Sequence, residues 1–145
     1  MKNSYEILKN EIQKAYNEFP IGFAFSNEQF ENEKKRLNVK NDNELVSIGY
    51  GGFIRKADIK KYEKLITENA EKLQNAIASD KTGDDFIKDM FYYELANHEY
   101  CVTYDYTETL DACGYTIDDI RKDKRLANGL EKATKEYLDS SKDWM

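Results

Sequence analysis

The chain has 145 residues, of which 40 % are hydrophobic and 34 % charged, and its formal net charge is −6. This length predicts a single domain over residues 1–145 that can bury a core without disulfide staples. The acidic balance argues against direct nucleic-acid binding. Because no run of about 18 apolar residues occurs, we expect no membrane span.

The first element predicted is an amphipathic helix over residues 3–19, where apolar side chains recur at spacings of three and four. Pro20, the only proline, ends it. Ser26 followed by Gln29 is typical of a capping box, so a second helix should run over residues 27–37.

The middle of the chain predicts a β-hairpin. Residues 45–50 alternate between apolar and small or polar side chains, as a short strand does. Gly51 and Gly52 then precede a second β-prone run, and a glycine pair at that place suits a tight turn that needs positive φ. We expect this hairpin to be the only β element.

The C-terminal part predicts helices separated by short loops. Gly114 suits the end of one of them, and Thr116 with Asp119 suits the start of the next. The expected helices cover residues 57–79, 84 to about 99, 107–113, 117–121 and 125–139. The tail, residues 140–145, should fray. Together the elements predict an α+β fold that is predominantly α-helical, with a small β-hairpin packed on helices.

Residues 92–114 contain the groups best suited to chemistry. His98 is the only histidine, and Cys101 and Cys113 are the only cysteines. Thiolates and imidazole are the natural ligands of zinc, and Cys101 follows His98 where the helix should end. We therefore predict a zinc site with His98, Cys101 and Cys113 as ligands. Asp105 or Asp111 can supply a fourth, oxygen ligand, and we assign Asp105.

The same residues have other interpretations. His98 lies four residues after Glu94 and shares its helix face, so a carboxylate can satisfy the histidine while both thiols pack as small apolar groups. A Cys–His nucleophile is a weaker interpretation, because no oxyanion loop can be recognised, and we assign no catalytic residue. The tyrosines can pack in the core or form a protein-binding face.

The charge and the N-terminus also bear on function. The N-terminal residues lack the apolar core of a signal peptide, so we expect a cytoplasmic protein. Many cytosolic domains are acidic for solubility alone. The alternative is a functional acidic face that engages a basic partner, such as the nucleic-acid groove of another protein.

Three motifs occur in order along the chain: FAFSNEQF at residues 23–30, IGYGGFIRKAD at 48–58 and FYYELANHEYCVTYDYTETLDACG at 91–114. Together they resemble a family of small uncharacterised proteins carried by phages and other mobile elements of Gram-positive bacteria. The resemblance covers most of the chain.

Small acidic phage proteins of this type include anti-CRISPR proteins of type II systems. The resemblance therefore implies a non-enzymatic inhibitor that binds a CRISPR effector nuclease, or another basic host protein, through an acidic, tyrosine-rich surface. The alternative is a small metal-dependent enzyme or a regulatory module of the phage.

Overall fold

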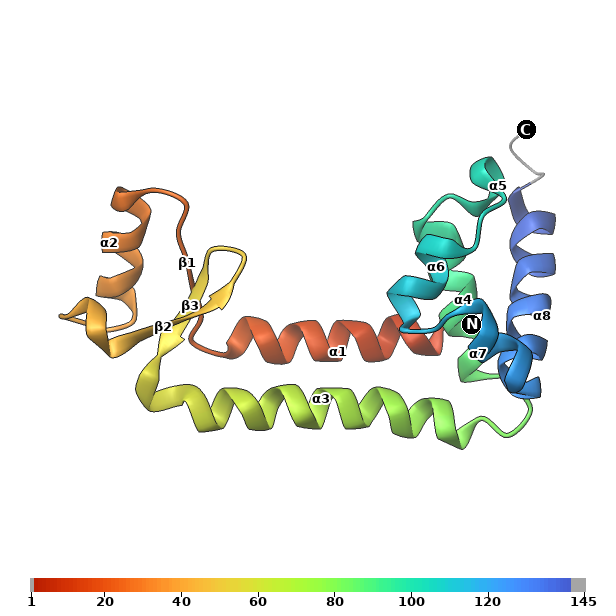
Figure 1. Ribbon diagram of the computed structural model, residues 1–145, viewed down its shortest axis with the longest axis horizontal. Coiled ribbons are helices and arrows are strands. Elements are labelled where there is room, and N and C mark those ends of the chain that lie inside the picture. The colour runs from red at the N-terminus through yellow and green to blue at the C-terminus, as the bar shows by residue number, and fades with distance from the viewer. Residues whose placement is uncertain (1, 142–145) are drawn as a thin grey trace. The chain divides into compact units, whose positions relative to one another are not determined.

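The chain forms helices joined by short loops and one small antiparallel sheet, as the computed structural model of the protein shows for residues 2–141 (Figure 1). The α-helices are α1 (Ser4–Glu18), α2 (Asn27–Arg36), α3 (Ile59–Ser79), α4 (Phe86–Asn97), α5 (Tyr100–Thr103), α6 (Thr107–Cys113), α7 (Ile117–Lys122) and α8 (Lys124–Ser141). The strands are β1 (Gly22–Phe23), β2 (Leu45–Gly49) and β3 (Gly52–Arg55), and short 3-10 turns precede β2 and α3.

Contacts divide the chain into two compact units. We call residues 11–71 the sheet unit, and residues 1–10 with 72–145 the helical unit. The predicted α+β class, predominantly helical with a small hairpin on helices, is confirmed. The single-domain assignment of residues 1–145 stays a prediction. Of the tail predicted to fray, Ser140 and Ser141 belong to α8, and residues 142–145 lie outside the described residues.

The sheet unit is built on the predicted hairpin, with β3 between β2 and β1. Its side chains pack against α2 through a small buried cluster of Leu37, Val39 and Phe53, and the ring of Phe30 meets Phe53 edge-on. Ser26 caps α2 by accepting a hydrogen bond from the Gln29 backbone N–H. The Gln29 side chain accepts a hydrogen bond from the Phe25 backbone N–H and not from Ser26, so the reciprocal half of the predicted capping box is absent. The sheet is therefore anchored to the helix that Ser26 caps.

The hairpin turn lies one residue earlier than the sequence predicts. Tyr50 and Gly51 hold positive φ, at 54° and 78°, while Gly52 already belongs to β3 and pairs with Gly49. Positive φ at both central residues is the geometry that matches the twist of a two-residue hairpin. Tyr50, which is 99 % exposed, occupies a position that usually favours asparagine or glycine.

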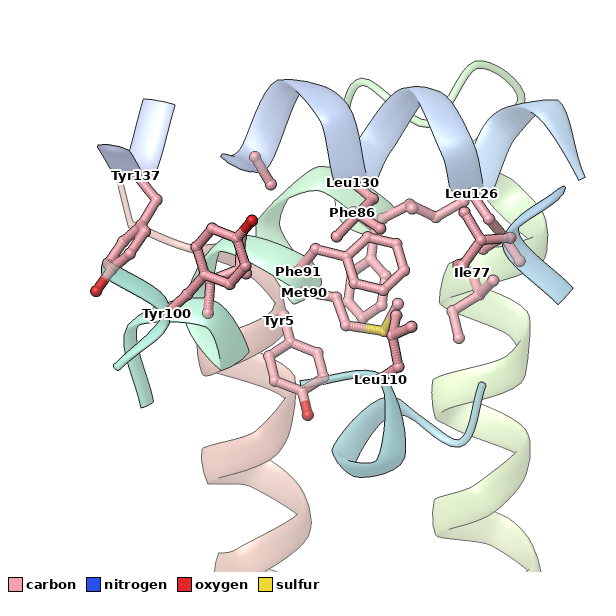
Figure 2. Close-up of a cluster of buried hydrophobic side chains, with 14 residues drawn as sticks. Tyr5, Ile77, Phe86, Met90, Phe91, Tyr100, Leu110, Leu126, Leu130 and Tyr137 are labelled. Carbon is pink, nitrogen blue, oxygen red and sulfur yellow. The ribbon is translucent and has the colours of Figure 1, made fainter. Parts of the chain in front are cut away.

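The helical unit is organised by the packing of α4 on α8. Ile87, Met90, Phe91 and Leu95 of α4 are fully buried, and Figure 2 shows how Leu126 and Leu130 of α8 meet this cluster. The two helices approach closely at Gly129, where an added Cβ would lie 2.6 Å from a methyl group of Ile87. Tyr5, from the start of α1, completes one side of the core.

Asp80 joins the end of α3 to the start of α4. Its buried carboxylate accepts hydrogen bonds from the backbone N–H groups of Thr82 (3.3 Å), Gly83 (2.8 Å), Asp85 (3.0 Å) and Ile87 (3.0 Å). Arg125 at the start of α8 donates to the carbonyl groups of Ile77 (3.1 Å) and Asp80 (2.9 Å). The backbone N–H groups that lead into α4 and the carbonyl groups at the end of α3 thereby find hydrogen-bond partners in one place.

We predict that Gly51→Val lowers the free energy of unfolding by about 1–3 kcal/mol, because valine at positive φ is strained. Gly51→Asn should lose less than half as much, because asparagine tolerates this backbone region. The exposed ring of Phe25 lies against Gly51 and can swing aside in both variants. Urea unfolding of the three proteins measures the effect, and equal losses in the two variants would show that φ is not the cause.

We also predict that Asp80 stabilises the folded protein and that this stabilisation is lost at acidic pH. Burial raises the pKa of its carboxyl, but the four N–H groups outweigh this and hold the pKa below its usual value. A depressed folded-state pKa gives stability that is complete above the unfolded value of about 3.9 and is lost as the pH falls through the folded value.

Melting temperatures between neutral pH and pH of about 3 should therefore fall less steeply for Asp80→Asn than for the parent protein. At neutral pH the variant should be less stable by on the order of 2 kcal/mol, because it loses charge-assisted hydrogen bonds. The control is Asp85→Asn, whose side chain caps no helix and which should follow the parent curve. Parallel curves for Asp80→Asn and the parent would contradict the assignment.

Candidate protein-binding surface

The negative charge of the protein is concentrated in one segment. Residues 89–120 contain eight acidic residues and no lysine or arginine, whereas the rest of the chain contains 20 acidic and 22 basic residues. This segment forms most of α4, all of α5 and α6, and the first four residues of α7. Six of its acidic residues are exposed: Glu99, Asp105, Glu108, Asp111, Asp118 and Asp119. We call these six residues the acidic surface.

Two residues in the left-handed backbone region shape the segment. Glu99 (φ 51°) and Tyr104 (φ 53°) flank the short helix α5, and each holds a left-handed backbone conformation at one end of it. Beyond Tyr104, Tyr106 stacks on Tyr100, with ring centroids 4.6 Å apart and planes inclined by 17°. Tyr104 stands edge-on to the same Tyr100 ring and is 67 % exposed.

An open hollow of about 500 Å³ lies beside these rings. Its lining combines aromatic rings with carboxylates, and Leu110 is its most buried member. The lining residues are Tyr104, Asp105, Tyr106, Thr107, Leu110, Asp111, Tyr115, Thr116 and Ile117. We call this feature the tyrosine hollow. It combines rigid aromatic area with acidic groups, the combination that engages basic protein surfaces.

The tyrosine hollow is held by contacts to the helical core. The hydroxyl of Tyr106 lies 2.9 Å from Thr134 Oγ1 on α8, and the Tyr115 ring packs near Phe91 with centroids 6.5 Å apart. Asp105 Oδ1 accepts hydrogen bonds from the Thr107 backbone N–H (2.9 Å) and hydroxyl (2.7 Å), which holds the pKa of this carboxyl below its usual value. Contacts within the chain therefore hold Tyr106, Tyr115 and the Asp105 carboxylate in place.

His98 lies between two carboxylates. Glu94 is fully buried on α4, and its Oε2 lies 3.7 Å from His98 Nε2, while its Oε1 lies 3.4 Å from Lys9 Nζ. On the other side, Glu108 Oε2 lies 3.5 Å from His98 Nδ1. The predicted shared face of Glu94 and His98 is thus present, but Glu94 does not satisfy the histidine as the packing interpretation expects, because His98 Nε2 is buried and has no hydrogen-bond partner in the described part of the chain.

The other predicted zinc ligands lie in different surroundings. Burial raises the pKa of the Cys113 thiol to about 12, with a further contribution from the Glu94 carboxylate that Lys9 opposes. Cys101 is half-buried, and its backbone N–H lies 3.5 Å from the Tyr137 hydroxyl. The Asp105 carboxylate binds Thr107 instead of turning toward His98.

Within residues 2–141, no three histidine, cysteine, aspartate or glutamate side chains gather as a metal site would require. The structure therefore does not bring His98, Cys101, Cys113 and Asp105 together, and zinc stays a prediction. The sequence argument chose these residues by type and missed the tyrosine hollow. The signal that points to the hollow is the 32-residue stretch without a lysine or arginine.

Comparison with known proteins places most of the chain in one family. The model of a family of unknown function, DUF7659, matches residues 4–136. The chain belongs to this family. No curated protein and no solved structure shows a significant match. No helix in the described part of this DUF7659 protein is long and apolar enough to cross a membrane.

The zinc prediction has a direct test. Protein purified without a histidine tag should contain about one equivalent of zinc, lost in His98→Ala and in Cys101→Ala, and a chelator should lower its melting temperature. Both thiols must lose a proton to bind zinc, so the raised pKa of Cys113 makes the affinity fall on acidification. A zinc content below about a tenth of an equivalent, together with a melting temperature that a chelator does not change, would contradict the zinc prediction and leave packing as the remaining interpretation.

Proposed function

We propose that this DUF7659 protein is a non-enzymatic inhibitor that binds a basic surface of another protein through the acidic surface and the tyrosine hollow. The observation that carries the proposal is the segregation of charge. Eight acidic residues without a lysine or arginine lie in residues 89–120, while the rest of the chain has two more basic than acidic residues.

Segregated charge favours binding over simple solubility. A protein that is acidic for solubility alone needs no region free of cations, because interspersed charges of both signs serve that purpose. Among the described residues, only Asp118 of the acidic surface pairs with an arginine, Arg121 at 3.6 Å. Asp105 and Asp119 accept hydrogen bonds from Thr107 and Thr116, and Glu108 lies 3.5 Å from His98. Within residues 2–141, none of the surface carboxylates other than Asp118 has a lysine or arginine partner, and a basic protein would supply one.

The tyrosines supply binding area beside the charge. Tyrosine buries a large amphipathic surface and loses few rotatable bonds when it is immobilised, so it is frequent among the residues that dominate binding energy. Tyr104 and Val102 are both more than two-thirds exposed, at 67 % and 68 %, on the short helix α5 and its end. An apolar centre with an acidic rim is thus available in this region.

The partner we propose is a CRISPR effector nuclease, and the resemblance to phage and mobile-element proteins supports this choice. Such a nuclease holds its guide and target in a positively charged channel. An acidic surface placed in that channel would act as a nucleic-acid mimic and prevent guide or target loading. On this proposal the protein is phage- or prophage-encoded, acts in the bacterial cytoplasm and binds no nucleic acid itself.

The proposal predicts a stoichiometric complex with a type II effector nuclease that weakens as salt rises from about 0.05 to 0.3 M, where the Debye length shortens to below 10 Å. The variant Asp105→Asn/Glu108→Gln/Asp111→Asn should bind at least about tenfold more weakly, mainly through a slower association rate. Surface plasmon resonance with the immobilised nuclease, with and without its guide RNA, measures both effects.

The matched control is Glu28→Gln/Glu63→Gln/Glu71→Gln in the sheet unit, which removes the same three charges from exposed positions. It should bind as the parent protein does. Loss of binding in the control to the same extent would mean that only net charge matters. If no complex with such a nuclease forms even at low salt, the nuclease is not the partner.

A further inference from the structure

We propose that the tyrosine hollow is a receptor site for an arginine side chain of the partner protein. This inference rests on the proposed function, because it assigns the chemical group that the acidic surface recognises. It goes further in predicting a preference for guanidinium over ammonium at one defined place. The site would be formed by Tyr104, Tyr106 and Tyr115 and by the carboxylates of Asp105 and Asp111.

The walls of the hollow suit a planar cation. Three tyrosines line it, and the Tyr106 ring is fixed on one side by its stack with Tyr100 and at its hydroxyl by Thr134. A fixed aromatic face attracts a cation through its quadrupole, and a guanidinium group can also stack on it. An ammonium group is a compact, strongly hydrated charge that gains less from such a wall.

The charges of the hollow are also those an arginine needs. Asp105 and Asp111 are its two charged lining residues, and neither forms an ion pair with a lysine or arginine in the described part of the chain. Asp105 binds Thr107 through Oδ1 alone, so Oδ2 is available for a guanidinium N–H. Arginine recognition by carboxylates is strongest where such oxygens are already fixed.

The composition of the hollow favours a cationic side chain with an apolar stem. The hollow is open, with a volume of about 500 Å³, and buried Leu110 offers apolar surface to the methylene groups of an arginine stem. Thr107 and Thr116 add hydroxyl groups to the lining. An acidic ligand would meet Asp105 and Asp111 without a compensating cation, and a purely apolar one would leave their charges unpaired.

The test uses the full-length protein and four-fold repeats of three peptides, Gly-Ser-Arg, Gly-Ser-Lys and Gly-Ser-citrulline. Citrulline keeps the shape of arginine but has no charge. Fluorescence anisotropy should give an affinity for the arginine peptide at least about threefold above that for the lysine peptide, with no measurable binding of the citrulline peptide. Amide signals of residues 104–117 should shift on titration with the arginine peptide.

Variants place the site within the hollow. Tyr104→Leu and Asp111→Asn should each weaken arginine-peptide binding at least about threefold, while Tyr104→Phe, which keeps the ring, should bind as the parent does. Tyr50→Leu is the matched control for Tyr104→Leu, because both tyrosines are exposed and hold positive φ. Glu63→Gln is the control for Asp111→Asn. Melting curves show which variants remain folded.

The outcomes separate this inference from the proposed function. Equal affinity for arginine and lysine peptides, or unchanged binding in both hollow variants, overturns the arginine site even if a nuclease complex forms. If the hollow variants lose the arginine peptide and no nuclease complex exists, the arginine site stands and the nuclease partner falls. Binding of the citrulline peptide as tightly as the arginine peptide would show that charge is not recognised, and would also overturn the site.

Discussion

The buried carboxylate of Asp80 is the interaction on which the helical unit depends. It satisfies four backbone N–H groups of the loop and first turn that lead into α4, while Arg125 satisfies two carbonyl groups where α3 ends. A buried charge is tolerated only with such complete hydrogen bonding. Because Arg125 belongs to α8, the same contacts set where α8 starts beside α4. The core between these two helices then follows from their apolar faces.

The acidic surface and the tyrosine hollow depend on that core in turn. Helices α5, α6 and α7 are four to seven residues long, which is too short for independent stability, so tertiary packing must hold them. Leu110 and Ile120 supply buried side chains from α6 and α7, and Tyr106 reaches Thr134 on α8. The segment with the highest negative charge is therefore also one with little local stability. Mutual repulsion among its carboxylates acts against folding, and a basic partner would relieve that repulsion.

Local signals in the sequence were sufficient where one residue decides the geometry. Ser26, Gly114 and Thr116 mark helix ends that the structure confirms, because each acts through its own side chain or backbone freedom. The hairpin was predictable as an element, but its turn was shifted to Tyr50 and Gly51, since pairing between β2 and β3 fixes the register. Strand β1, only two residues long, exists through its pairing with β3 and has no local signature.

The site was harder to predict for a related reason. Residue type suggested metal ligation at His98, Cys101 and Cys113, but side-chain directions depend on where α4 ends and on the left-handed residue Glu99 that follows. Tyr104 repeats that geometry at the other end of α5. A bulky residue with positive φ costs on the order of 1 kcal/mol, and such strain persists where surrounding structure or function maintains it. At Tyr104 the strained backbone keeps an aromatic ring exposed at the edge of a carboxylate-lined hollow, where core packing gains little from it. The local strain and the exposed ring concern one residue inside the segment that lacks cations, and the proposed recognition of a cationic partner would account for all three features.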